Sequence, residues 1–361
     1  MRKLIVGLVA LVLLALVVGI GALAYVRSGE QPREGMETVT GLRAPVEVIW
    51  TDHAVPHVFA GSLHDAVFAQ GFLHARDRLW QMELVRRAIQ GRLAEVLGEP
   101  ALETDRFLRR VGLWDAARRD AAAMPPDDRA LLQAYADGVN AALERWSGPL
   151  PPEFLVLGFE PEPWAPVHTI AVAKMLSLTL ASYGQSLAVA RALRRLPRDR
   201  ARWLFPEFPD WDATILPPAP EIPPLARSLV DRYSFAAASN SWVVDGSRTA
   251  SGRPILANDM HLELQAPSLW YMAGLHAPAT DTFPALDAVG TTVAGAPLVV
   301  AGRNRAIAWG YTNAYVDDVD LFIERVDPAD STRYLTPDGS RPFEVRAETL
   351  SVKGREAPVV M

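Results

Sequence analysis

Residues 236–244 read Ala-Ala-Ala-Ser-Asn-Ser-Trp-Val-Val, so a run of small residues passes directly into a short apolar segment at Ser239. The prolines within residues 216–224 cannot continue a helix or occupy a central strand, and they predict an extended, exposed connector before this point. After it, the apolar runs 242–244 and 254–257 flank an Asp-Gly turn and are typical of two strands. The chain therefore changes its structural character close to Ser239.

The residues before the connector favour helices. Ser62 and Asp65 have the spacing of a capping box, and good helix formers follow, with a weak point at Gly91. The predicted elements are two short strands within residues 42–60 and helices over residues 66–97, 126–146 and 167–195. Charged residues three and four apart, from Glu83 to Arg87, predict solvated salt bridges on one face of the first helix. Helices first and strands afterwards are typical of the α+β class.

The amino terminus has the composition of a membrane-crossing helix. Arg2 and Lys3 precede an uncharged run, residues 4–26, that is long enough to cross a hydrocarbon layer about 30 Å thick. A cleavable signal peptide is the alternative, because residues 22–24 supply a small-x-small site. We expect an uncleaved signal-anchor. With the basic residues on the cytoplasmic side, the rest of the chain would lie outside the cytoplasm, in the periplasm or beyond the cell.

Composition excludes several classes of protein. The 361 residues are 50% hydrophobic and 22% charged, which suffices for a large core. The absence of cysteine excludes disulfides, zinc–cysteine sites and a cysteine nucleophile. Because the formal net charge is −6, we expect no nucleic-acid partner.

Familiar catalytic motifs are missing from the sequence. It has no HExxH zinc helix, no phosphate-binding loop, no G-x-S-x-G elbow and no Ser-x-x-Lys pair. His53, His57, His64 and His74 form a locally dense group of histidines. A metallohydrolase using this group is an alternative, but nothing in the spacing brings the four rings together.

Ser239 is the candidate nucleophile that remains. Most serines beside a strand are turn or capping residues, and Ser234, Ser241 and Ser247 compete with it. A serine that follows small residues could attack its own upstream carbonyl in a strained turn, and the amine set free has a pKa of about 7.7–8.0. Such an amine suits general-base catalysis near neutral pH.

Several short blocks follow one another in an order similar to that of a known family. They are residues 52–57 (DHAVPH), 70–83 (QGFLHARDRLWQME), 91–95 (GRLAE), 239–244 (SNSWVV), 257–262 (ANDMHL), 302–304 (GRN) and 308–312 (AWGYT). Each block alone has moderate specificity, but their joint order is a strong signal. The chain resembles the penicillin acylase (penicillin amidase) family of amino-terminal-nucleophile (Ntn) hydrolases.

The resemblance implies an αββα sandwich and a precursor that cuts itself between Ala238 and Ser239. Ser239 would be the nucleophile and, through its free α-amine, its own general base, with no cofactor required for the chemistry. The enzyme would cleave the acyl amide bond of an N-acylated small molecule, with β-lactam side chains and acyl-homoserine lactones as candidate substrates. The two processed chains would stay together as a heterodimer.

The resemblance also assigns roles in the second chain. The main chain of His261 would orient the nucleophile, and the backbone N–H of Asn313 would donate to the oxyanion, an effect worth about 2.7–4 kcal/mol per donor. Asp317, Val319 and Asp320 match a calcium-binding segment of some members. Two interpretations of these three residues remain, a structural calcium site and a polar turn. The reason is that the helical stretch that would supply the family's calcium-binding Glu has no acidic residue.

Chains of this family continue for several hundred residues past the length seen here, so we expect a truncated chain. A catalytically incomplete, membrane-anchored binding or scaffold module of the same fold is therefore the alternative function. Apolar residues within 174–182 would line the acyl pocket, although core packing explains them more simply. The expected organisation is a signal-anchor (1–27), a linker (28–40), a mainly helical first chain (41–205), a connector or spacer (206–238) and an incomplete β-rich second chain (239–361).

Overall fold

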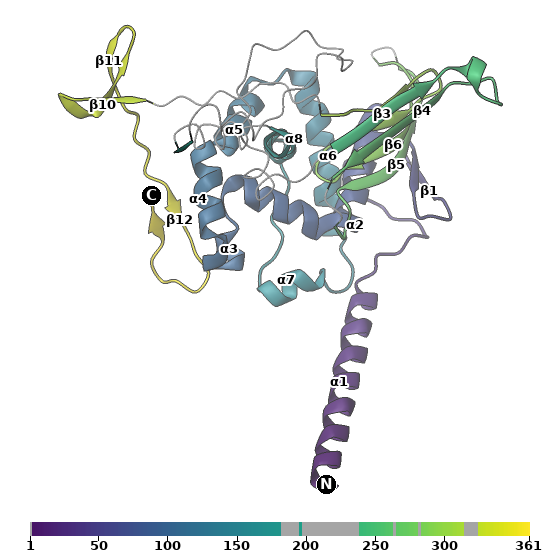
Figure 1. Cartoon of the computed structure of the whole chain (residues 1–361). Coiled ribbons are helices and arrows are strands. Elements are labelled where there is room, and N and C mark those ends of the chain that lie inside the picture. The colour runs from purple at the N-terminus through teal and green to yellow at the C-terminus, as the bar shows by residue number, and fades with distance from the viewer. Residues whose placement is uncertain (1, 182–194, 197–237, 263–264, 281–282, 314–323) are drawn as a thin grey trace. The chain divides into compact units, whose positions relative to one another are not determined.

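The computed structural model describes residues 2–181, 195–196, 238–262, 265–280, 283–313 and 324–361 (Figure 1). These residues form two compact units. The first comprises Met1–Met175, Gln265–Trp309 and Ala347–Met361, and the second comprises Leu176–Leu264 and Gly310–Arg346. Most of the predicted connector lies outside the described residues, so the domain boundaries stay predictions.

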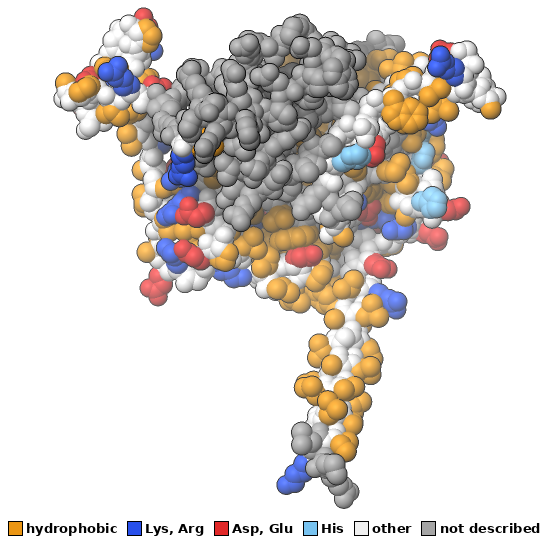
Figure 2. All heavy atoms as spheres, in the orientation of Figure 1, with side chains coloured by type: hydrophobic (Ala, Val, Ile, Leu, Met, Phe, Trp, Pro, Cys, Tyr) orange, Lys and Arg blue, Asp and Glu red, His pale blue; other side chains and the backbone are white. Residues whose placement is uncertain are grey.

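An apolar helix, α1 (Arg2–Ser28), begins the first unit. Its segment Ile5–Ser28 has a mean hydropathy of 3.0, and no part of its most apolar stretch is buried. Figures 1 and 2 show the helix standing clear of the other elements of its unit, with hydrophobic side chains along its length. Its length and composition would let it cross a membrane, and a signal sequence has the same properties.

Helix α2 (Leu63–Gln90) begins at the predicted cap, where the side chain of Ser62 accepts a hydrogen bond from the backbone N–H of Asp65 at 3.1 Å. The predicted end of this helix is wrong. Gly91, in the left-handed region with a φ of 60°, ends α2, and a separate short helix, α3 (Ala94–Leu97), follows. Glycine adopts this conformation readily because it has no Cβ.

Further helices follow along the first unit. They are η1 (Glu99–Ala101), α4 (Leu102–Val111), α5 (Leu113–Ala123), α6 (Pro126–Glu144), α7 (Pro152–Leu157) and α8 (Pro166–Leu180), which runs into the second unit. Helices α2 and α6 pack closely through two glycines. A Cβ at Gly138 would lie 1.9 Å from the carbonyl oxygen of Phe68, and one at Gly71 would lie 2.2 Å from that of Tyr135. Only hydrogen fits at these two positions.

A six-stranded sheet packs against α2. Its strand order is β1 (Glu47–Trp50), β2 (Pro56–Phe59), β5 (Trp270–Ala277), β6 (Leu286–Val293), β7 (Ala301–Arg303) and β8 (Ala308–Trp309). Neighbouring strands are antiparallel except β2 and β5, which run parallel with His57 opposite Gly274. Side chains alternate between the two faces, and Leu275 lies on the face that packs against Ala66 and Leu73 of α2.

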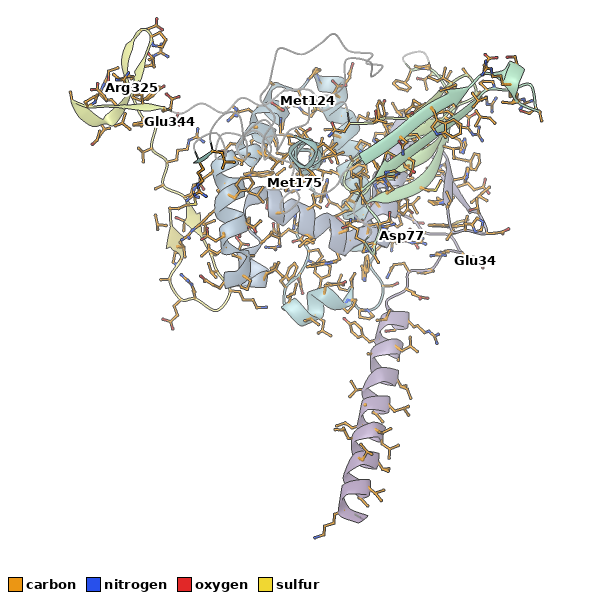
Figure 3. The ribbon with its side chains drawn as sticks, in the orientation of Figure 1. Glu34, Asp77, Met124, Met175, Arg325 and Glu344 are labelled. Carbon is orange, nitrogen blue, oxygen red and sulfur yellow. The ribbon has the colours of Figure 1, made fainter. Side chains whose placement is uncertain are left out.

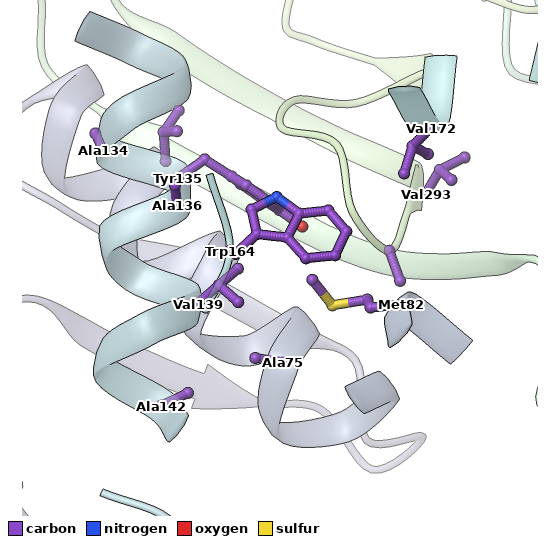
Figure 4. Packing of buried hydrophobic residues seen from close by; sticks show 12 residues of the cluster. Ala75, Met82, Ala134, Tyr135, Ala136, Val139, Ala142, Trp164, Val172 and Val293 are labelled. Carbon is purple, nitrogen blue, oxygen red and sulfur yellow. The ribbon is translucent and has the colours of Figure 1, made fainter. Parts of the chain in front are cut away.

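The core of the first unit contains Trp164, which packs with Met82, Val139 and Val172 (Figure 4). The indole N–H donates to the hydroxyl of Thr169 at 3.1 Å. The polar group of the ring is therefore satisfied inside the core, where an unpaired donor would be costly.

The charges near the end of α2 are buried, so the prediction of solvated salt bridges is wrong. Glu83 and Arg86 are 3% and 0% exposed. One carboxylate oxygen of Glu83 accepts from Nε of Arg87 at 2.6 Å, and the other pairs with Arg86. Glu162, from outside the helix, pairs with Arg92 at 2.7 Å, and hydrogen bonds from Arg92 lower the pKa of Glu162 to about 2. The mutual pairing offsets the cost of removing these charges from water.

The second unit carries the strands around Ser239. Strands β3 (Ala238–Val244) and β4 (Ile255–His261) form an antiparallel pair joined through η2 (Gly246–Arg248), and a separate sheet has the order β11 (Gly339–Pro342), β10 (Asp330–Thr336) and β9 (Arg325–Asp327). Two short strands, β12 (Thr349–Leu350) and β13 (Val359–Val360), pair within the first unit. The predicted α+β class is confirmed, with the two early strands β1 and β2 ahead of helices α2 to α8 and the other strands after them.

Candidate active site

The hairpin of β3 and β4 holds Ser239 in extended backbone. Ser239 lies opposite Met260, and the preceding residue, Ala238, lies opposite His261. Ser239 is half-buried. The peptide bond between Ala238 and Ser239 is thus part of a regular two-stranded ladder, which fixes its direction.

Local sequence explains why a hairpin forms here. Trp242, Val243 and Val244 favour a strand, and the side chain of Asp245 accepts from the N–H of Ser247 at 2.8 Å, which closes the turn. The hydrogen bonds from Ser247 lower the pKa of Asp245, so this carboxylate stays ionised and keeps its acceptor role.

The imidazole of His261 pairs with a neighbour on its own strand. Its Nε2 lies 2.6 Å from Oδ2 of Asp259, and both side chains are exposed. The backbone of His261, in contrast, pairs with Ala238. This geometry fits a role that uses the main chain of His261 rather than its ring.

Asn258 connects the hairpin to the segment that carries Asn313. Its Oδ1 accepts from the N–H of Tyr311 at 3.1 Å, and its Nδ2 donates to the carbonyl oxygens of Tyr311 and Asn240 at 3.0 and 3.2 Å. A Cβ at Gly310 would lie 2.5 Å from Oδ1 of Asn258, so glycine permits this approach. The sequence analysis did not place Asn258 among the site residues. The feature that could have pointed to it is a polar amide in the middle of a predicted strand.

The segment with Asn313 is also held from its other side. The side-chain Nδ2 of Asn313 donates to the carbonyl oxygen of Leu180, at the end of α8, at 3.0 Å. Residues 311–313 are therefore fixed by two side-chain amides, one from Asn258 and one of their own. Such anchoring suits a segment whose backbone N–H must keep one orientation.

The predicted calcium ligands Asp317, Val319 and Asp320 lie outside the described residues. In the part of the chain that is described, no group of three or more acidic or histidine side chains could hold a metal ion. The calcium prediction stays a prediction.

The early histidines have separate partners. Nδ1 of His57 lies 3.0 Å from Nε2 of His276, and His64 lies 3.1 Å from Asp65. Burial and the neighbouring His276 lower the pKa of His57. His74 lies in the core, and its burial lowers its pKa to about 3.

A sequence model of the penicillin amidase family matches residues 45–361, which include Ser239, His261 and Asn313. The chain belongs to the penicillin amidase family. It is 33% identical to the acyl-homoserine lactone acylase QuiP of Pseudomonas aeruginosa, over 90% of this chain and 40% of that protein. It is 38% identical to the penicillin acylase 2 proenzyme of Pseudomonas sp. strain SE83, over 81% of this chain and 39% of that protein.

The chain spans about two fifths of the length of these penicillin amidase relatives. A solved chain of a thermostable penicillin G acylase from Alcaligenes faecalis is 29% identical, with a TM-score of 0.37, and the match covers 50% of this chain and 98% of that chain. Family membership agrees with the Ntn-hydrolase class predicted from the sequence.

Proposed function

We propose that this chain is part of an exported amidohydrolase that processes itself and removes the acyl group from an N-acylated small molecule through Ser239. The observation that carries the proposal is the place of Ser239 as the second residue of β3, with Ala238 paired opposite His261. The ladder pairs the residues on both sides of the bond that would be cut.

Self-processing would begin with attack of the Ser239 hydroxyl on the carbonyl carbon of Ala238. The C–N bond then breaks, its nitrogen takes a proton, and an ester joins Ala238 to the Ser239 oxygen. Water hydrolyses this ester. The products are a carboxylate on Ala238 and a free α-amine on Ser239, which is the general base for the next reaction.

Acyl transfer would use the same hydroxyl. The α-amine takes the proton of the Ser239 hydroxyl as its oxygen attacks the substrate amide, and the proton passes to the amine that leaves. The acyl ester on Ser239 is then hydrolysed by water. We assign the backbone N–H of Asn313 to the oxyanion, because Asn258 and the Asn313 amide hold that segment in place.

The names of the relatives support two substrate classes. The alignments with an acyl-homoserine lactone acylase and with a penicillin acylase both extend over most of this chain. In each class the bond cut would be an amide between an acyl group and a small amine. A series of acyl-homoserine lactones and penicillins with matched acyl groups, assayed on the same preparation, would assign the substrate.

Helix α1 would anchor the protein in a membrane, with the remainder of the chain outside the cytoplasm. The supporting facts are the length of its apolar segment, Ile5–Ser28, and the basic residues Arg2 and Lys3 before that segment. For Asp317, Val319 and Asp320, a rise in melting temperature with calcium but not with magnesium would support a structural calcium, and no rise would favour the polar turn.

Mass spectrometry and amino-terminal sequencing of the full chain test self-processing. We expect a new terminus at Ser239. Ser239→Ala should abolish it, whereas Ser241→Ala, two residues along the same strand, should leave it in place. A wild-type chain that stays uncut would overturn the proposal and favour the alternative, a binding module without catalysis.

A further inference from the structure

The junction between β2 and β5 is short. Three residue pairs form it, from His57 opposite Gly274 to Phe59 opposite His276. Among the described strands, β1 and β2 have no other neighbour in the six-stranded sheet, so this junction alone joins them to the rest of it. The backbone N–H of Ala60 adds one hydrogen bond to the carbonyl oxygen of His276 at 2.9 Å. A side-chain contact across so short a junction therefore contributes much of what keeps it closed.

Two histidines meet across this junction. Nδ1 of His57 lies 3.0 Å from Nε2 of His276, and the planes of the two rings differ by 10°. Gly274 makes room for the pair, because a Cβ there would lie 2.4 Å from Nδ1 of His57. Phe59 stacks on the ring of His276, with 4.5 Å between the ring centres. A hydrogen bond between the two rings therefore joins β2 to β5.

The other partners of His276 fix the direction of this bond. Its Nδ1 lies 2.6 Å from Oδ1 of Asp287, directly opposite on β6, and the second oxygen of Asp287 accepts from Arg305. Hydrogen bonds from Arg305 and His276 lower the pKa of Asp287, so this carboxylate stays ionised and accepts from Nδ1. Nε2 of a neutral His276 is then the acceptor, and Nδ1 of His57 is the donor.

The bond between the rings tolerates one added proton but not two. A proton taken up by Nε2 of His57 leaves its Nδ1–H directed at His276, so the bond is kept. When both rings are cationic, two N–H groups face each other across 3.0 Å and repel. Burial and the neighbouring His276 lower the pKa of His57, which keeps this ring neutral at neutral pH. The contact is therefore attractive at neutral pH and repulsive in acid.

The other charged groups near this face of the sheet do not cancel a second proton. The register of the strands puts Glu47 of β1 and Arg303 of β7 on the same face, and both side chains are exposed. Asp77 of α2 (Figure 3) lies on the other face, where it accepts from the hydroxyl of Tyr271 at 2.7 Å. In the part of the chain that is described, Asp287 is the carboxylate that pairs with the rings, and one carboxylate neutralises one cation.

We propose that His57 and His276 form an acid-sensitive clasp, which holds β2 on β5 at neutral pH and releases β1 and β2 from the sheet when both rings are protonated. Release would leave β5 at the edge of the sheet and would free the residues that lead into α2, while the helices stay folded. The clasp does not depend on self-processing, so its test applies equally to an uncut chain.

Hydrogen exchange of the full chain, followed by mass spectrometry from pH 7.5 to 4.5 and corrected for intrinsic exchange rates, tests the clasp. Helix α6 is the internal reference, because its Tyr135 is the partner of His74 and its amides report any global loss of stability. We expect the protection of residues 56–60 to fall at least tenfold more than that of α6 between pH 6.5 and 4.5. An equal fall in both segments, or no fall in either, would overturn the proposal.

His57→Asn separates the clasp from other titrations. The Asn amide can still donate to Nε2 of His276 but cannot take up a proton, so residues 56–60 should stay protected at pH 7.5 and lose the extra fall in acid. His53→Asn, in the exposed turn before β2, should keep the wild-type pH dependence. An extra fall that persists in His57→Asn would show that the two rings are not the clasp.

Asp287→Asn is a second variant, informative even if His57→Asn does not fold. It removes the negative charge that offsets one cation but keeps an acceptor for Nδ1 of His276. Residues 56–60 should then lose protection at a higher pH than in the wild-type chain. Loss at the same or a lower pH would contradict the proposal.

Discussion

The hydroxyl of Tyr135 donates a hydrogen bond to Nδ1 of His74 at 2.7 Å, and both side chains are fully buried. The direction follows from the other partners. Thr292 gives its proton to the carbonyl oxygen of Tyr271, so its oxygen accepts from Nε2 of His74 at 2.9 Å. The N–H of Gly295 donates to the Tyr135 hydroxyl at 2.9 Å. His74 is therefore neutral, in one tautomer, at the centre of a satisfied network.

Acid should destabilise the fold through His74. Burial lowers its pKa in the folded chain from 6.5 to about 3, so below pH 6.5 the unfolded chain binds a proton that the folded chain does not. The free energy of unfolding should then fall by about 1.4 kcal/mol per pH unit in this window. Urea unfolding from pH 7.5 to 4.5 measures the slope. His74→Gln should be less stable at pH 7.5 but flatter below pH 6.5, and an equal slope in both proteins would contradict this account.

Gly138→Ala should destabilise the first unit strongly. The new Cβ would lie 1.9 Å from the carbonyl oxygen of Phe68, which cannot move without displacing α2. We expect a loss of about 3 kcal/mol, as for severe overpacking. Gly61→Ala is the matched control, because its Cβ would lie 3.6 Å from that of Ala44, an ordinary contact. Thermal unfolding that is equally affected in both variants would argue against the close packing of α2 and α6.

Removing the buried carboxylate of Glu83 should lower the free energy of unfolding more than removing an exposed carboxylate does. Glu83→Gln leaves Arg86 and Arg87 buried beside a neutral amide, and we expect a loss of about 3–5 kcal/mol. Glu103→Gln breaks an exposed pair with Arg106 and should change stability by less than about 1 kcal/mol. Denaturant titration of both variants gives the comparison, and similar small losses would mean that the buried pairs are weak.

Asn258→Asp should slow self-processing without unfolding the first unit. The substitution keeps Oδ1 but removes the donor to Tyr311 and Asn240, which frees the segment with Asn313. We expect the Ser239 terminus to form at least tenfold more slowly, measured by mass spectrometry over time. Ser251→Ala, in the turn of the same hairpin, should process at the wild-type rate. Equal rates for Asn258→Asp and the wild type would remove Asn258 from the site.

Local signals in the sequence were enough to predict several elements. Ser62 caps its helix because the capping bond joins residues three apart, and the small residues before Ser239 do lead into a strand. The helix end at Gly91 was missed because isolated glycines occur within helices as well as after them. The left-handed backbone conformation distinguishes a glycine that ends a helix from one inside a helix. This conformation depends on the packing of the residues that follow.

Other features depend on contacts between distant residues. The charges of Glu83 and Arg86 have the spacing of a solvated face, but both side chains are buried, and Glu162, more than seventy residues later, adds a second carboxylate beside Arg86. Asn258 accepts a hydrogen bond from Tyr311, and no local sequence pattern connects these two residues. Spacing along a helix predicts which side chains can pair, but it does not predict whether they are buried or exposed.

The parallel pairing of β2 with β5 has a consequence for the fate of the polypeptide. Strands β1 and β2 precede the bond between Ala238 and Ser239, and strands β5 to β8 follow it, yet all belong to one sheet. Cutting that bond would therefore release no separate product. The two pieces would migrate together through a gel-filtration column in native buffer and part only in denaturant, so the reaction would convert one molecule into two chains held together by one sheet.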